Sequence, residues 1–266
     1  MKKPMNKRSD LYRRILKGER LDDVLIIDNH GHLGIGLFNS LPLEREVAET
    51  VAVMDAVGVD RGVAFFCGRD YHRGNQITLE SVAMAPGRFI PYANLNADAP
   101  PALLDELGRC RQAGMVGLKL HSSYSGAKFT DAIWKDVWAW CAQHHWPVII
   151  HGMEPCLARE NPQTVFIHAH GIECTFRDDV IQKMRECPNY YLDTSATMTA
   201  MGAIERVVAL FGADRLVFGS DFPGNSMVTR LGAVLAARIS DEDMRKILGG
   251  NIARLLNLKT RDSFPR

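Results

Sequence analysis

Four short apolar runs of this chain each end in histidine or aspartate. The runs and the residues that close them are 24–27 with Asp28, His30 and His32, 147–150 with His151, 164–167 with His168 and His170, and 216–220 with Asp221. Such runs, bounded by Gly, Pro or polar residues, are typical of strands buried on both faces of a parallel sheet. If these strands close into one barrel, all four ends share one rim. Imidazoles and a carboxylate meeting there could bind a divalent metal ion, because each supplies a lone pair.

His30 and His32 are separated by one residue, so on an extended strand their side chains point to the same side, and Asp28 shares that face. Two imidazoles from one strand could therefore bind the same ion. His151 would approach from the fifth strand and Asp221 from the eighth. We therefore predict one divalent ion, most favourably zinc, bound by His30, His32, His151 and Asp221, because three nitrogens and a carboxylate suit this borderline-soft cation.

The predicted ion would also supply chemistry. It keeps a net positive charge and can hold a water molecule in an open position, which lowers the pKa of that water toward neutrality. Asp221 could both bind the ion and accept the proton of the water, whereas His170 on the sixth strand could polarise a substrate carbonyl or position the water. We predict Asp221 and His170 as the catalytic residues.

The elements that must position these residues alternate along the chain. Further segments rich in β-forming residues are 61–67, 89–95, 116–121 and 189–194, which brings the expected strands to eight. Segments with helical spacing are 44–56, 78–85, 101–113, 131–144, 177–186 and 203–211. The alternation predicts an α/β fold, a single (β/α)8 TIM barrel with right-handed crossovers. We expect an abbreviated fifth crossover near Leu157–Glu160 and short C-terminal helices within 241–256 that pack across the outside of the barrel.

The length and the charge of the chain limit which classes of protein it can belong to. A chain of 266 residues suits one large domain, so residues 21–266 are expected to form the catalytic barrel, after a basic tail over 1–20 with one short helix at Asp10–Leu16. The formal net charge of +1 gives no reason to expect nucleic acid or a membrane surface as partner. No run approaches the roughly eighteen apolar residues that span a bilayer, and the cysteines lack a C-x-x-C spacing. We expect a soluble, cytoplasmic protein with a small-molecule substrate; a homo-oligomer is left open.

Seven segments occur in order at spacings compatible with a barrel. They are IDNHGH, GLKLH, PVIIHG, IHAHG, YYLDTSA, FGSDFP and ILGGNIARLL, and they fall within residues 24–256. In these segments the chain resembles the amidohydrolase superfamily of metal-dependent TIM-barrel enzymes, and specifically its amidohydrolase-related branch. The resemblance implies the same ligands as above, with His170 near the substrate. It also implies one zinc or similar ion, and activity as a hydrolase or as a nonoxidative decarboxylase of small carboxylic acids.

Other polar residues near the expected rim have two interpretations each. Arg69 and Arg73 follow the second strand and could bind an acidic substrate, or lie in a solvated loop. His121 is either structural or a substrate contact. His168 is expected to be hydrogen-bonded in the core below His170, and Asp28 to fix a nearby imidazole rather than bind metal. Lys119 occupies the fourth-strand position where binuclear relatives carry a carbamylated lysine, a bridge that is not usual in this branch.

Three functions compete. The first is a metal-dependent hydrolase that uses a metal-activated water on a small amide, lactone or ester. The second is a metal-dependent nonoxidative decarboxylase of a small carboxylic acid, in which Asp221 and His170 handle the proton. The third is a non-catalytic barrel used for binding, which would be expected to lack some of the ligands. None of the ligands is missing from the sequence, which favours an enzyme.

Overall fold

The computed structural model describes residues 9–34, 41–98, 100–154, 156–195 and 200–258. Its strands are β1 (Ile27–His32), β2 (Arg61–Phe65), β3 (Phe89–Pro91), β4 (Ala93–Asn94), β5 (Leu118–His121), β6 (Val148–His151), β7 (Phe166–His168), β8 (Tyr190–Asp193) and β9 (Leu216–Val217). Consecutive strands pair in parallel within two sheets, β1 to β3 and β4 to β9. β3 and β4 do not pair with each other; only Tyr92 separates them, so they share one strand position. In the described part of the chain, these strands therefore occupy the eight expected positions.

Backbone hydrogen bonds join the last strand position to the first. The N–H of Asn29 in β1 donates to the carbonyl of Phe218 just beyond β9, at 2.8 Å. Three residues further along, the N–H of Asp221 donates to the carbonyl of His30, also at 2.8 Å. The chain after β9 thus runs beside β1, and the strands close into the predicted TIM barrel.

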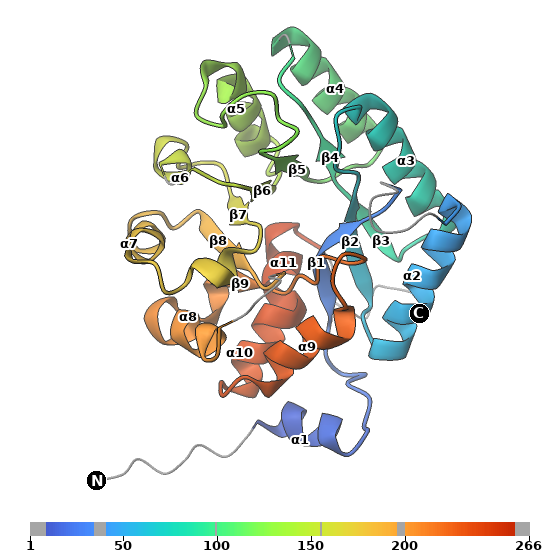
Figure 1. Ribbon diagram of the computed structural model, residues 1–266, viewed down its shortest axis with the longest axis vertical. Helices are drawn as coiled ribbons and strands as arrows, with labels where there is room; N and C mark the ends of the chain where they lie inside the picture. Colours follow the sequence, from blue (N-terminus) through green and yellow to red (C-terminus); the bar gives the residue numbers. More distant parts are fainter. Residues whose placement is uncertain (1–8, 35–40, 99, 155, 196–199, 259–266) are drawn as a thin grey trace.

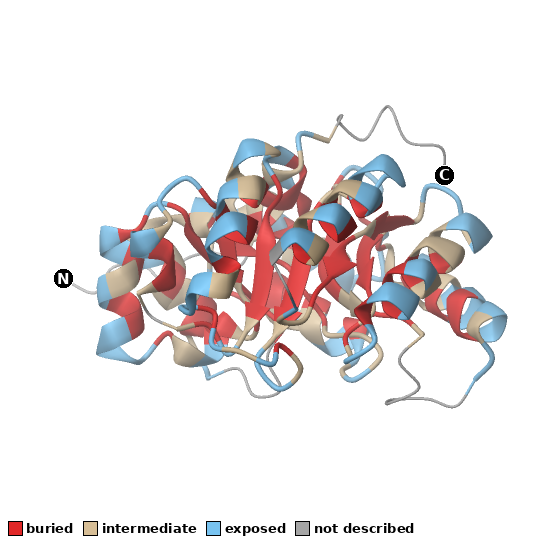
Figure 2. Ribbon diagram, turned by 90° about the horizontal axis from the view of Figure 1, so that it is seen from above, coloured by how far each residue is buried: buried red, intermediate tan, exposed pale blue. Residues whose placement is uncertain are grey.

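Helices surround the strands (Figure 1). They are α1 (Asp10–Leu16), α2 (Leu43–Val57), α3 (Tyr71–Met84), α4 (Pro100–Gln112), α5 (Lys135–Gln143), α6 (Leu157–Glu160), α7 (Asp178–Glu186), α8 (Ala203–Phe211), α9 (Met227–Ala236), α10 (Asp241–Arg245) and α11 (Asn251–Leu255). Figure 2 shows buried strands at the centre and helices whose outward faces are exposed. This layering explains the two sequence patterns, because strands buried on both faces read as apolar runs and half-buried helices read as amphipathic segments. The four-residue α6 confirms the abbreviated fifth crossover.

Three element predictions were wrong. The first strand spans Ile27–His32 rather than the apolar run 24–27, and it includes the two histidines that were expected on extended backbone. Helix α3 begins at Tyr71 rather than at 78. The sequence pattern missed its first turns because they bury Gly74 and Asn75, which do not contribute to an apolar period. Helix α9 was not expected at all, and Gly232 in its interior lowers the helix propensity of the segment.

One of the two C-terminal helices, α11, does not pack across the outside of the barrel as expected. Ile252 and Ala253 of α11 pack into the same cluster as the inward-facing Ile27 and Val217, so this helix closes the amino-terminal end of the barrel rather than crossing its outside. The π-helical turn before α11, Lys246–Gly250, lies close to the backbone of Leu25, just before β1. A Cβ on Gly249 would lie 2.4 Å from the carbonyl oxygen of Leu25, so only glycine fits there.

The N-terminal helix is attached to this closed end. Leu11 of α1 is buried, and the N–H groups of Asp10 and Leu11 donate to the carboxylate of Asp241 at 3.0 and 3.1 Å. Residues 1–8 of the expected basic tail lie outside the described residues. No helix of the described residues is long and apolar enough to cross a membrane. The six cysteines are free thiols.

Candidate metal centre

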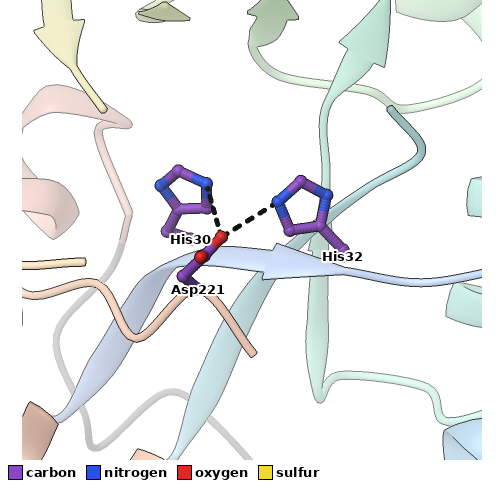
Figure 3. Close-up of side chains that lie close together, drawn as sticks. All are labelled: His30, His32 and Asp221. Atoms are coloured by element: carbon purple, nitrogen blue, oxygen red, sulfur yellow. Dashed lines mark hydrogen bonds and ion pairs between the residues drawn. The ribbon is translucent and has the colours of Figure 1, made fainter. Parts of the chain in front are cut away.

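Two imidazoles and one carboxylate meet where β1 runs beside the chain after β9. Oδ1 of Asp221 lies 3.3 Å from Nε2 of His30 and 3.1 Å from Nε2 of His32. One ligand atom from each residue lies within 4.8 Å of the other two, and Figure 3 shows both rings turned toward the carboxylate. This set of two nitrogens and one oxygen fits a divalent cation of the zinc or manganese type.

Local backbone geometry produces this convergence. The residue between the two histidines is Gly31, and a Cβ there would lie 3.0 Å from the carbonyl oxygen of Val63 on β2. Glycine therefore lets β1 lie close to β2 while both imidazoles face inward. Asp221 adopts a left-handed backbone conformation with φ of 66°, which aspartate tolerates better than most residues. Such conformations are concentrated at functional sites.

The two imidazoles are held in the neutral form that a metal ligand requires. Burial lowers the pKa of both His30 and His32, and the nearby Lys119 ammonium lowers each of them further. Burial opposes ionisation of Asp221, but its hydrogen bond with His32 and the neighbouring imidazoles outweigh burial and hold the pKa of this carboxyl below its usual range. At neutral pH the site therefore presents the lone pair of His30 Nε2 and the negative charge of Asp221. A metal ion would displace the proton that His32 Nε2 shares with Asp221.

Asp193 fixes the orientation of His30, a role that sequence reasoning did not assign. Its Oδ2 lies 2.8 Å from Nδ1 of His30, and its Oδ1 accepts hydrogen bonds from the N–H of His170 at 2.7 Å and from the hydroxyl of Ser195 at 2.6 Å. Because a carboxylate only accepts, Nδ1 of His30 carries the proton and Nε2 keeps its lone pair. The available signal was the YYLDTSA segment, whose aspartate closes β8.

Asp28 supports the site through the backbone rather than through an imidazole. Its Oδ1 accepts from the N–H of His30 at 3.0 Å and from the N–H of Ser220 at 2.8 Å, and Oδ2 accepts from the Ser220 hydroxyl. Burial raises the pKa of Asp28 to about 6, although the hydrogen bonds from Ser220 oppose that shift. Asp28 therefore ties β1 to the segment that carries Asp221.

Three further histidines form a row beside the three-residue group. The ring centroid of His170 lies 5.0 Å from that of His30, His151 lies 4.9 Å from His170, and His121 stacks on His151 at 3.9 Å. His151 is therefore near the centre, but its ligand atoms lie outside the compact group made by the described residues. Burial lowers the pKa of His151 to about 3, with a further contribution from His121.

His170 occupies a special backbone position. It follows β7 with a left-handed φ of 60°, and its Nδ1 lies within hydrogen-bond distance of the carbonyl oxygen and the hydroxyl of Ser195. Donation from Nδ1 to the carbonyl leaves Nε2 as the free lone pair. His168, two residues earlier, is hydrogen-bonded through Nδ1 to the phenol of Tyr190, which matches the structural role expected for it.

For Arg69 and Arg73, substrate binding or a solvated loop was left open, and both residues are exposed on the surface. Arg73 pairs with Glu80 of the same helix at 2.9 Å, and it lines a surface depression of about 430 Å³ together with Asp70, His72, Gln76 and Arg109. Arg69 is exposed, and its carbonyl accepts a hydrogen bond from Asn96. Neither arginine contacts the metal-binding group within the described residues.

The order of motifs around this centre is that of a known family. The family model described as Amidohydrolase matches residues 30–258. The chain belongs to the amidohydrolase family. This confirms the expected resemblance, and the family is one of enzymes. A comparison with curated proteins gave no match.

Solved structures share the fold at low sequence identity. A dihydroxybenzoic acid decarboxylase from Polaromonas sp. JS666, with bound manganese and 2-nitroresorcinol, superposes with a TM-score of 0.71 at 18% identity, covering 90% of this chain and 98% of that one. A 4-oxalomesaconate hydratase from Rhodopseudomonas palustris gives 0.68 at 18% identity, covering 88% and 96%. A TIM-barrel protein from Bordetella bronchiseptica gives 0.73 at 19%, covering 88% and 99%. These similarities confirm the TIM-barrel fold.

Proposed function

We propose that this amidohydrolase-family member binds one divalent metal ion, zinc, through His30, His32 and Asp221, with His151 as a fourth ligand. The observation that carries the proposal is the position of Asp221 Oδ1, within 3.3 Å of Nε2 on both strand-one histidines. Both nitrogens are buried and face the same oxygen. A carboxylate in contact with two neutral imidazoles is a ligand set that a cation completes.

When bound, the ion would supply an activated water molecule and polarise a substrate carbonyl. Side chains of the protein would carry out the proton transfers. Asp221 would accept the proton of the attacking water, and Nε2 of His170 would hold or deliver a proton at the substrate. We assign hydrolysis of a small amide, lactone or ester as the reaction.

A second candidate reaction is nonoxidative decarboxylation of a small carboxylic acid. The named activities of several structures with this fold favour it, because they include decarboxylases of 2,6-dihydroxybenzoate and of 5-carboxyvanillate. The same groups of this chain serve either reaction, with His170 delivering the proton that replaces carbon dioxide. We further propose that the substrate is acidic and that the protein works in the cytoplasm.

The test has two stages. Elemental analysis of the purified protein after dialysis should find about one divalent ion per chain, and His30→Ala combined with His32→Ala should abolish binding. The matched control is His144→Ala at the end of α5, which should retain the ion. The loaded protein is then screened with lactones, esters and aromatic acids for water addition against release of carbon dioxide. A stoichiometric ion in the double variant would remove the proposed site.

A further inference from the structure

Lys119 is a buried lysine at the centre of the barrel that forms no ion pair with the described residues, and burial lowers the pKa of its ammonium. Its side chain is fully buried on β5, and its Nζ lies 3.1 Å from Nε2 of His30 and 4.9 Å from the ring centroid of Phe65. No carboxylate of the described residues forms an ion pair with it. Lysine is rarely buried to this extent without a paired anion, because removing an ammonium from water is costly.

The buried carboxylates around the site are hydrogen-bonded to other groups. Asp193 accepts hydrogen bonds from His30 and from Ser195, and Asp28 accepts from Ser220. Asp221 contacts the two imidazoles of β1. Among the described residues, the three N–H donors of Lys119 therefore have one acceptor, which is Nε2 of His30.

Metal binding would remove that acceptor. The proton on Nδ1 of His30 is directed at Asp193, so Nε2 is the nitrogen left for a metal ion. Once its lone pair is shared with an ion, Nε2 cannot also accept a hydrogen bond from Lys119. The ammonium would then lie beside a second positive charge, without an acceptor from the described residues.

We infer that Lys119 binds the carboxylate of an acidic substrate at this centre. The inference rests on the proposed metal site and deepens it. An anion placed between the ion and Nζ supplies the missing acceptor and neutralises the charge of the lysine. Lys119 thereby selects carboxylic acids over neutral compounds of the same shape. This is the role that the sequence left open for Arg69 and Arg73.

The test uses benzoate and benzamide, which are similar in shape and differ in charge, as calorimetric probes of the zinc-loaded protein. Lys119→Met keeps the length of the side chain and suits a buried site. It should retain zinc, weaken benzoate binding by at least about tenfold, and leave benzamide binding unchanged. Lys135→Met, on the exposed start of α5, is the matched control and should behave as the wild type. If Lys119→Met does not fold, as judged by circular dichroism, Lys119→Gln replaces it.

Three results would overturn the inference. The first is equal benzoate affinity in Lys119→Met and wild type. The second is a carbon dioxide adduct on Lys119 by mass spectrometry with two ions per chain, which would make this residue a ligand. The third is a zinc-loaded wild type that binds no benzoate. Benzoate binding that requires Lys119, without turnover of any acid, ester or lactone, would instead contradict the proposed function and leave the inference standing.

Discussion

Oδ2 of Asp193 lies 2.8 Å from Nδ1 of His30, and neither side chain is accessible to solvent. The contact joins β8 to β1 across the barrel interior. Through it the carboxylate decides which nitrogen of His30 carries the proton and which faces Asp221. Asp193 also accepts a hydrogen bond from the backbone N–H of His170. One buried residue therefore orients both His30, the proposed ligand, and His170, the proposed acid-base group.

Asp193→Asn should weaken metal binding about 10- to 100-fold, as loss of an outer-shell carboxylate typically does. The amide cannot accept the Nδ1 proton with the same strength, so His30 loses its fixed tautomer. Competition with a chelator of known affinity measures the change. Asp136→Asn on the exposed face of α5 is the control and should bind as the wild type does. Unchanged affinity in Asp193→Asn would assign the residue a purely structural role.

His170→Asn should keep the metal ion but lower turnover by roughly a hundredfold or more, the usual cost of losing a positioned acid-base group. Metal content and steady-state rates on the same preparation separate the two effects. His144→Asn, at the end of α5, controls for the loss of a histidine and should remain active. Full activity of His170→Asn with bound metal would make His170 structural.

Asp221→Asn should bind metal weakly and turn over near background even when metal is supplied in excess. The amide keeps an oxygen donor of similar size but cannot accept a proton. In the wild type, activity should rise with pH through one ionisation that belongs to the metal-bound water and Asp221 together. A variant that recovers most of its activity on addition of metal would show that Asp221 is only a ligand, and the base would then be sought at His170 or His121.

The metal-free protein should lose stability as the pH falls below about 6.5. Burial lowers the pKa of His168 to about 4 and that of His121 to about 4, so the unfolded chain binds protons that the folded chain does not. Stability from these groups is present above their unfolded pKa and is lost as the pH falls toward 4. The raised pKa of Asp28, about 6, opposes this trend over the same range.

His168 provides the cleanest measurement of that pH dependence, because it is bonded to Tyr190 and is not a proposed ligand. Each such histidine contributes a slope of up to about 1.4 kcal/mol per pH unit in the free energy of unfolding. His168→Gln should flatten the slope between pH 6.5 and 4 in urea denaturation of the metal-free protein. An unchanged slope would show that His168 titrates alike in the folded and unfolded chains.

The sequence by itself determined the barrel and the residue types at its rim. Apolar runs and amphipathic segments arise from burial on two faces or on one, so local periodicity predicted the alternation of strands and helices. Parallel strands then required His30, His32, His151 and Asp221 to end at the same rim. The same reasoning could not find α9 or the start of α3, where glycine and buried polar residues obscure the period.

Only the tertiary structure decided which of these residues touch. His30 and Asp193 are 163 positions apart, and no local pattern encodes that pairing. The same holds for Lys119 against His30 and for α11 against the amino-terminal end of the barrel. It also holds for His151, which lies beside His170 rather than within the compact ligand group. These contacts depend on side-chain reach across the closed barrel, which is fixed only when all the strands have taken their register.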